Sequence, residues 1–356
     1  MRVTSWDGEA FRASIQGALD EFLGEMTDRL APLGPDASRL LDEARGVVSG
    51  GKRFRAAFCY WGYRAVRPEV DDEHALFRAC AALELLHASA LVHDDYMDAS
   101  DTRRGRPATH RAFTAEHRED RWRGDPAQYG ASAAILLGDL LLSWADELLR
   151  RCGLPAAEVS AAMDVFDLCR SEVIAGQFLD VSVQARGLAD VDTAMTVLRF
   201  KSAKYSIERP LHIGAALAGA SADTLTALSS FGLPLGEAFQ LRDDLLGVFG
   251  DADTTGKPAG DDLVEGKRTV LVALTLDTAG QEDAAALDRM LGTPLDTAQV
   301  ARARQIIDES GAHAQVEMVI KELADRALAA LDRSPIDDRA RVVLRELASA
   351  ATQRVV

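Results

Sequence analysis

The chain has 356 residues, of which 40 are Lys or Arg and 56 are Asp or Glu, so its formal net charge is −16. Such an acidic surface repels nucleic acid and anionic membranes, and we expect neither nucleic-acid binding nor membrane insertion. Apolar residues make up 47% of the chain, which excludes a wholly disordered protein. Because Met1 to Glu9 lacks the pattern of a signal peptide and the four cysteines form no CxxC pair, we expect reduced thiols and a cytoplasmic location.

Apolar residues recur at intervals of three and four along most of the chain, which is typical of amphipathic α-helices. In chain order, the predicted helices cover Ala10–Leu30, Leu76–Met97, Ala131–Leu149, Val159–Asp180, Ala222–Val248, Thr269–Leu276 and Ile320–Leu331. Short segments rich in Gly and Pro separate them, and none resembles an interdomain linker. We therefore predict an all-α fold built as a single large helical bundle, although roughly 150 residues per domain would allow two domains.

An acidic cluster ends the second predicted helix at His93-Asp94-Asp95-Tyr96-Met97-Asp98. Asp94 and Asp98 are one turn apart and share a helix face. Carboxylates at a helix C-terminus repel one another and oppose the helix dipole, so a structural role rarely needs them. Magnesium binds to such oxygen-rich groups together with substrate phosphates, but a solvated acidic helix end is an equally good alternative for this cluster alone.

Adjacent arginines follow the acidic cluster at Arg103-Arg104-Gly105. Guanidinium groups presented in a turn suit phosphate oxygens, although a charge-balancing surface loop has the same composition. Carboxylates followed within a few residues by arginines are what a magnesium–diphosphate site requires.

A second acidic group lies in the helix predicted over Ala222–Val248, where the sequence reads Gln240-Leu241-Arg242-Asp243-Asp244-Leu245-Leu246-Gly247. Gln240 shares a helix face with Asp243 and Asp244 because the spacing is three and four residues. Downstream, Asp251 offers a further oxygen, and Lys257 and Lys267 each follow a glycine. Since no strand precedes these lysines, a nucleotide-binding P-loop is disfavoured, and we expect them to contact phosphate as point charges.

Two more basic segments are Gly50-Gly51-Lys52-Arg53-Phe54-Arg55 and the pair Lys201 and Lys204, one helical turn apart. The paired glycines would let a ligand approach the backbone closely. Each basic segment alone is explained by solvated charge. Together with the two acidic clusters they need one shared cavity, so we predict a single domain over residues 1–356.

Taken in order, these motifs resemble those of the trans-isoprenyl diphosphate synthases. The resemblance rests on Gly50–Arg55, Asp94–Asp98 with Arg103–Gly105, Lys201–Ala203, Gln240–Gly247, and Lys257 with Lys267. It covers about residues 47–270, and it implies an all-α bundle around a deep apolar cavity, usually in a homodimer.

The resemblance also implies roles for individual residues. The implied magnesium ligands are Asp94, Asp98, Asp243 and Asp244, which would hold three Mg²⁺ ions recruited with an allylic diphosphate. The implied contacts to that diphosphate are Arg103, Lys201, Ser202, Gln240 and Lys257, and the implied catalytic set is Asp94, Asp98, Arg103, Lys201, Gln240 and Lys257. The implied pocket for isopentenyl diphosphate contains Lys52, Arg55, His87 and Arg104, with Lys267 as a supporting cation.

These roles describe a prenyltransferase that condenses an allylic diphosphate with isopentenyl diphosphate, head to tail. One alternative is a class I terpene cyclase, which needs neither a second substrate pocket nor a second paired-aspartate motif. Another is a non-catalytic partner subunit, which the intact Asp94, Asp98 and Arg103 disfavour.

Two positions depart from the family pattern: Gly247 stands where many members have Asp, and Ser202 stands where Thr is common. Ser89 and Ala90, one turn before Asp94, are too small to block a growing chain. We therefore predict geranylgeranyl diphosphate or a somewhat longer product, with Leu86 and Leu85 as candidate residues for the cavity floor.

Overall fold

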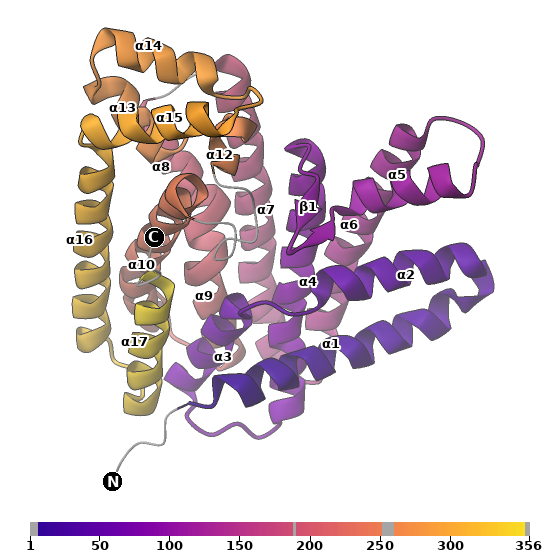
Figure 1. The fold of residues 1–356 in the computed structure, drawn as a ribbon. Helices are drawn as coiled ribbons and strands as arrows, with labels where there is room; N and C mark the ends of the chain where they lie inside the picture. Colours follow the sequence, from indigo (N-terminus) through magenta and orange to yellow (C-terminus); the bar gives the residue numbers. More distant parts are fainter. Residues whose placement is uncertain (1–5, 188–189, 251–259, 353–356) are drawn as a thin grey trace.

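The computed structural model describes residues 6–187, 190–250 and 260–352, and within these ranges nearly every element is a helix, as predicted (Figure 1). The first part of the chain forms α1 (Gly8–Leu30), η1 (Ala31–Leu33), α2 (Pro35–Val48), α3 (Phe54–Val66), α4 (Glu73–Met97), α5 (Thr109–Glu119), α6 (Pro126–Arg150) and α7 (Ala156–Arg186). The second part forms α8 (Val191–Val197), η2 (Leu198–Glu208), α9 (Arg209–Leu217), α10 (Ala222–Phe249), α12 (Asp261–Glu265), α13 (Val270–Thr278), α14 (Gln281–Met290), α15 (Thr297–Glu309), α16 (Ala312–Arg333) and α17 (Asp338–Thr352). A two-stranded antiparallel ribbon, β1 (Thr102–Arg103) with β2 (Arg106–Pro107), follows α4.

Helix α4 is the central helix of the first half and packs against α1, α3 and α6. It begins where the Asp72 side chain accepts a hydrogen bond from the Ala75 N–H, and it ends at the acidic cluster. Among the described helices, α4 alone is long and apolar enough to cross a membrane, but 78% of its apolar window is buried inside the protein. Such burial is typical of the core helix of a soluble protein.

Buried side chains form two apolar clusters, one centred on α1, α3, α4, α6, α7 and α9 and the other on α10, α13, α15 and α16. Helix α10 joins the two clusters, since its Phe231 belongs to the first and its Leu245 to the second. Figure 1 shows α13, α14 and α15 gathered at one end of the molecule. All four cysteines are buried and unpaired.

Segment η2 is a π-helix held between α7 and α10. At one point on each side its backbone comes close to the neighbouring helix, because a glycine of that helix faces it there. A Cβ atom at Gly176 on α7 would lie 2.5 Å from the backbone nitrogen of Lys201. A Cβ atom at Gly236 on α10 would lie 2.5 Å from the carbonyl oxygen of Ala203. The backbone of η2 therefore leaves no room for a side chain at these two glycines.

Because η2 is a π-helix, Lys201 and Lys204 do not share a face as expected. In an α-helix the two would share a face, but π-helical pairing joins residues five apart and changes that spacing. Lys204 turns to Glu172, with its Nζ 2.5 Å from Oε1, whereas Lys201 turns into the cavity described below. The prediction that both lysines serve one site is therefore wrong for Lys204.

Candidate active site

A cavity of about 1340 Å³ lies between α3, α4, α7, η2 and α10, and residues of α12 also line it. It brings together residues that the sequence places far apart. The predicted site residues that line it are Lys52, Arg55, His87, Asp94, Arg103, Arg104, Lys201, Ser202, Gln240, Asp243, Asp244 and Lys267. Asp98 lies beside this lining, and Lys257 and Asp251 fall outside the described residues.

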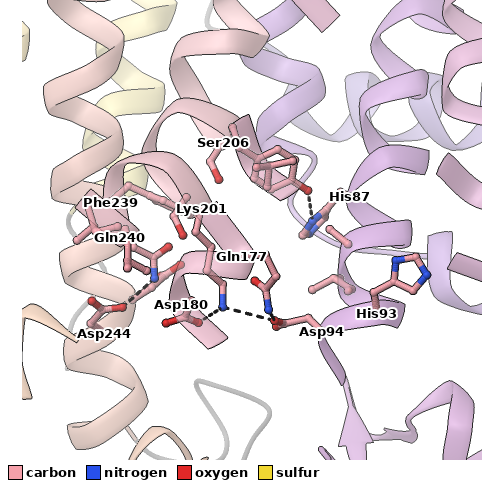
Figure 2. Close-up of a pocket in the computed structure, with 18 of the residues that line it drawn as sticks. His87, His93, Asp94, Gln177, Asp180, Lys201, Ser206, Phe239, Gln240 and Asp244 are labelled. Atoms are coloured by element: carbon pink, nitrogen blue, oxygen red, sulfur yellow. Dashed lines mark hydrogen bonds and ion pairs between the residues drawn. The ribbon is translucent and has the colours of Figure 1, made fainter. Parts of the chain in front are cut away.

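Asp94 on α4 is held by two residues from other elements. Its Oδ1 accepts hydrogen bonds from Gln177 Nε2 at 2.9 Å and from Lys201 Nζ at 3.4 Å. Lys201 Nζ also donates to Asp180 Oδ2 at 2.6 Å, so the ammonium lies between two carboxylates (Figure 2). Burial acts to raise the pKa of Asp94, but the charges of Lys201, Lys267 and Arg103 outweigh it and lower that pKa below its ordinary value.

Asp98, the residue that ends α4, faces a different cation. Its Oδ2 lies 3.8 Å from Lys267 Nζ, which also lies 3.1 Å from Asp262 Oδ1 and 2.5 Å from Glu265 Oε2. Burial, together with repulsion from Asp94, raises the pKa of Asp98 to about 7. The two carboxylates of the first motif are therefore paired with separate lysines.

The second acidic motif faces the cavity from α10, across from Asp94 (Figure 2). Gln240 Nε2 donates to Asp244 Oδ1 at 2.8 Å, which agrees with the helix face that their spacing of four residues predicted. Burial raises the pKa of Asp244 to about 7, and the neighbouring Asp262 adds to that rise. Asp243 also lines the cavity.

The fit of this donor set to a metal ion follows from its chemistry. In the part of the chain that the structure describes, no three His, Cys, Asp or Glu side chains converge closely enough to hold a metal by themselves. The carboxylates instead surround ammonium groups, so the site already holds positive charge between its acidic side chains. Because Mg²⁺ is bound through one or two carboxylates plus substrate phosphates, carboxylates on opposite walls of a cavity fit it when a diphosphate lies between them.

Arg103 and Arg104 diverge at the wall of the cavity. Arg103 donates from Nε to both carboxylate oxygens of the buried Asp95, at 2.9 and 3.2 Å, so this middle aspartate of the motif orients an arginine. Arg104 has a left-handed φ of 52° and donates from Nη1 to the Ser49 carbonyl oxygen at 3.1 Å. A Cβ atom at Gly51 would lie 3.0 Å from Arg104 Nη2, so this glycine, which also lines the cavity, makes room for the arginine.

A basic pocket forms where α3 faces η2. Arg55 donates from Nη2 to Ser206 Oγ at 2.8 Å, and its guanidinium carbon lies 4.3 Å from the centre of the Tyr205 ring. The Tyr205 hydroxyl lies 3.0 Å from His87 Nδ1. Burial and the nearby Arg55 and Arg104 lower the pKa of His87 well below its ordinary value, so this histidine is neutral at pH 7.

Below the charged groups the cavity wall is apolar. Along α4 it includes Leu86, Ser89 and Ala90, as predicted, but not Leu85, which is fully buried among other core side chains. The prediction that Leu85 helps to form the floor is therefore wrong. Other apolar lining residues come from α3, α6, α7 and α10, among them Phe58, Ile135, Leu142, Val173, Ile174, Phe178 and Phe239.

Sequence reasoning missed several polar residues of this cavity. Gln177 and Asp180 interrupt the apolar pattern of α7 three residues apart, and that interruption is the one signal that the sequence offered for them. Tyr205 and Asp262 carried no signal that separates them from ordinary core and surface residues.

Comparison with known proteins decides the family. The sequence profile of the polyprenyl synthetases matches residues 38–309. The chain belongs to the polyprenyl synthetase family. It is therefore a trans-prenyltransferase of a magnesium-using family, and the terpene-cyclase alternative is not supported.

Individual relatives are similar over most of their length. A geranylgeranyl pyrophosphate synthase from Corynebacterium glutamicum, solved with isoprenyl diphosphate and magnesium, is 41% identical with a TM-score of 0.96, covering 98% of this chain and 100% of that chain. A geranylgeranyl diphosphate synthase from Mycobacterium tuberculosis is 33% identical, covering 83% of this chain and 79% of the relative. A geranylfarnesyl diphosphate synthase from Aeropyrum pernix is 31% identical, covering 87% of this chain and 92% of the relative.

Proposed function

We propose that this polyprenyl synthetase condenses an allylic diphosphate with isopentenyl diphosphate to form geranylgeranyl diphosphate, with residues 1–356 acting as one domain. The observation that carries the proposal is the layout of one cavity. Carboxylates from α4 and α10 face each other at one end, arginines and a neutral histidine lie to one side, and an apolar chamber extends beneath them. A site drawn from both halves of the chain supports a single domain.

Asp94, Asp98, Asp243 and Asp244 are the residues that would hold three magnesium ions together with the allylic diphosphate. When bound, the ions neutralise negative charge that develops on the leaving diphosphate. We expect the ions to bind together with the substrate, because the carboxylates of Asp94 and Asp98 are each paired with a lysine.

The cations of the cavity divide between two diphosphates. Arg103 and Lys201 stand on the side of Asp94 and, with Ser202, Gln240 and Lys257, would contact the allylic diphosphate and stabilise it as it leaves. Lys52, Arg55, His87 and Arg104 form the other group and would hold isopentenyl diphosphate with its double bond close to the allylic carbon. Lys267 supports the acidic end.

His87 lies beside Arg55 and Arg104, and its role is to orient a phosphate by hydrogen bonding. The apolar wall excludes water, which would otherwise quench the allylic cation. The proton lost after condensation leaves on the released diphosphate.

An exposed apolar surface supports a homodimer. Several large apolar side chains on α6 and α7 are exposed. Leu136 and Leu168 do not line the cavity, whereas Ile135, Ile174, Phe178 and Val181 are exposed at its wall, as are Tyr96 and Met97 of α4. Contiguous apolar patches on a protein surface mark interaction sites. A second copy of this chain covering α6 and α7 would bury them, and we place the dimer in the cytoplasm.

Purified protein supplied with isopentenyl diphosphate, Mg²⁺ and either dimethylallyl, geranyl or farnesyl diphosphate tests the proposal. The expected main product is geranylgeranyl diphosphate, identified by mass spectrometry after phosphatase treatment. A cyclic hydrocarbon formed without isopentenyl diphosphate would overturn the proposal. Absence of turnover with every primer would instead mark a non-catalytic subunit.

A further inference from the structure

The basic segment Gly50–Arg55 contains a buried arginine. Arg53 is 5% exposed, although the preceding Lys52 is exposed. Its backbone is left-handed, with φ 55° and ψ 35°, at the residue that precedes α3. A residue with a Cβ atom keeps this conformation only where its surroundings fix it. The contacts of the Arg53 side chain therefore determine how the segment enters α3.

Both terminal nitrogens of the Arg53 guanidinium donate to acceptors of the protein. Nη1 donates to Glu84 Oε2 on α4 at 3.1 Å. Nη2 donates to Gln16 Oε1 on α1 and to the carbonyl oxygen of Val48 at the end of α2, each at 2.6 Å. The side chain thus joins three helices at the point where a fourth begins, and its charge is directed at groups of the protein.

Glu84 is the buried counter-charge of Arg53 and also contacts the first turn of α3. The side chains of Arg53 and Glu84 are 4% and 5% exposed. Glu84 Oε1 accepts a hydrogen bond from the Ala56 N–H at 3.3 Å, in the turn where backbone N–H groups have no partner within their own helix. A buried ion pair contributes little net stability, so stability alone does not explain this pair.

The segment that Arg53 fixes carries two cations of the pocket assigned to isopentenyl diphosphate. Lys52 and Arg55 line the cavity on either side of Arg53, and Glu84 also lines it. Without a positive partner, the Glu84 carboxylate would repel an incoming diphosphate. Arg53 neutralises that carboxylate and at the same time ties the backbone between the two cations to the core.

We propose that Arg53 is a positioning residue of the isopentenyl diphosphate pocket and not a ligand of the diphosphate. Its contacts with α1, α2 and α4 hold Lys52 and Arg55 where they meet the substrate. The inference rests on the proposed function, whose second pocket it deepens. It predicts that the affinity for isopentenyl diphosphate depends on Gln16, a residue of α1 that does not line the cavity.

Three variants separate positioning from charge. Arg53→Lys keeps a positive charge beside Glu84, but an ammonium group lacks the planar fork that spans these acceptors. Arg53→Met combined with Glu84→Gln removes both charges, and the glutamine keeps an acceptor for the Ala56 N–H. Gln16→Met removes one acceptor of Arg53 and leaves the ion pair in place.

Arg78→Met is the matched control. Arg78 is also buried and also ties α4 to α1, through Glu21 Oε1 at 2.9 Å and Glu25 Oε1 at 3.1 Å, but it does not line the cavity. This variant therefore reports what a weakened contact between α1 and α4 does by itself.

Steady-state kinetics gives the KM for each substrate with the other one saturating, and thermal unfolding shows which variants fold. Calorimetry gives the Kd for isopentenyl diphosphate without turnover, in Mg²⁺ and an allylic thiolodiphosphate that does not ionise. Arg53→Lys and the double variant should raise the KM and Kd for isopentenyl diphosphate by about 10-fold, and Gln16→Met by about 3-fold, the scale of weakened hydrogen bonds. The KM for the allylic substrate should change far less, and Arg78→Met should change neither KM.

Full affinity for isopentenyl diphosphate in Arg53→Lys or in the double variant would show that Arg53 only neutralises Glu84, and it would overturn the proposal. Equal weakening of both substrates, or equal weakening in Arg78→Met, would overturn it as well. If the Arg53 variants do not fold, unchanged affinity in Gln16→Met has the same meaning. A wild-type enzyme that binds isopentenyl diphosphate but makes no prenyl diphosphate would count against the proposed function instead, and the calorimetric comparison would still decide the role of Arg53.

Discussion

Lys201 and Lys267 each place a positive charge between two carboxylates of the site. Lys201 lies between Asp94 and Asp180, and Lys267 between Asp98 and Asp262. Without these ammonium groups, several buried carboxylates would repel one another across a cavity with little water. The lysines thus offset the repulsion between these carboxylates.

Removing a single motif carboxylate tests the metal assignment. Asp94→Ala and Asp243→Ala should each lower kcat by about 100–1000-fold, the usual cost of losing one group that stabilises developing charge. Both should stay folded, because Lys201 keeps Asp180 as a partner and no core side chain is removed. Steady-state kinetics at saturating Mg²⁺ and circular dichroism provide the measurement. Near-normal turnover in either variant would contradict the assignment of that residue.

Arg104 tests the division of the cavity into two diphosphate pockets. Arg104→Ala should raise the KM for isopentenyl diphosphate more than that for the allylic substrate, and the lost charge-assisted contact should cost about 1.5–3 kcal/mol. Lys257→Ala should do the reverse. Arg106→Ala is the matched control, since Arg106 pairs with Glu43 and does not line the cavity. Equal effects of Arg104→Ala on both KM values would reject the division.

The acidic end predicts a pH dependence for Mg²⁺. The pKa values of Asp98 and Asp244 are both about 7, so below that pH a metal ion must displace protons from them. The apparent Mg²⁺ affinity should therefore rise from pH 6 to about pH 7 and then level off. Without metal, the free energy of unfolding should fall as the pH rises toward 7. The reason is that between pH 3.8, their ordinary pKa, and about pH 7 these two carboxyl groups bind more protons in the folded protein than in the unfolded chain.

Mg²⁺ titrations of turnover and thermal unfolding with and without Mg²⁺, at pH 6, 7 and 8, check both trends. The diphosphate also titrates in this range, so Asp98→Asn serves as the control. It should flatten the rise in affinity, and an unchanged slope in that variant would show that Asp98 does not contribute to the rise.

At the scale of elements, α4 positions the reacting end of the substrate and also shapes the chamber for its tail. Ala90 lines the cavity one turn before Asp94. Ala90→Phe should shorten the main product by about one isoprene unit, because the added ring fills the channel. Product analysis by mass spectrometry is the measurement, and Ala90→Ser, which hardly changes volume, is the control. An active Ala90→Phe enzyme with an unchanged product would show that the tail does not run along this face.

Long apolar helices were predictable from sequence and several shorter ones were not. The stripe over Ala10–Leu30 lies within α1, and those over Leu76–Met97 and Ala222–Val248 lie within α4 and α10. Each of these three helices extends by one to a few residues beyond the predicted stripe at one end, because the additional residues do not continue the apolar pattern. Helices α5, α14 and α15 bury few apolar residues, which left little pattern to detect. The π-helical turn of η2 was beyond reach, because it follows from packing against α7 and α10.

The site was predictable where residue types are chemically specific. Aspartates and adjacent arginines at a helix end indicated a metal–phosphate site, and the structure brings those residues to one cavity. Gln177 and Asp180 were not predicted because a polar residue on a long helix usually faces solvent. Asp262 escaped because Lys267 brings it near Asp98 in three dimensions, which no spacing along the chain reveals.

At the scale of the whole molecule, the apolar surface on α6 and α7 predicts the oligomeric state. Leu136 is 62% exposed and does not line the cavity, so Leu136→Glu should disrupt a dimer without touching the site. Met318→Glu on α16 is the matched control, because Met318 is 61% exposed but lies outside this surface. Analytical ultracentrifugation should show a dimer for the wild type and the control, and a monomer for Leu136→Glu. A wild-type monomer would reject this interface.

The glycines that hold η2 have a consequence for how this enzyme can be altered. A methyl group at Gly176 or Gly236 would have to widen its contact from 2.5 Å to at least 3.4 Å, where ordinary van der Waals contact begins. The atoms in contact are backbone atoms. Rotating a side chain therefore cannot relieve the clash, and a whole helix must move. Since α7, η2 and α10 are walls of the cavity, alanine at these glycines would change its width from positions outside the cavity lining. Substrate selection can therefore drift, in evolution or in engineering, through residues that a survey of the cavity lining would never sample.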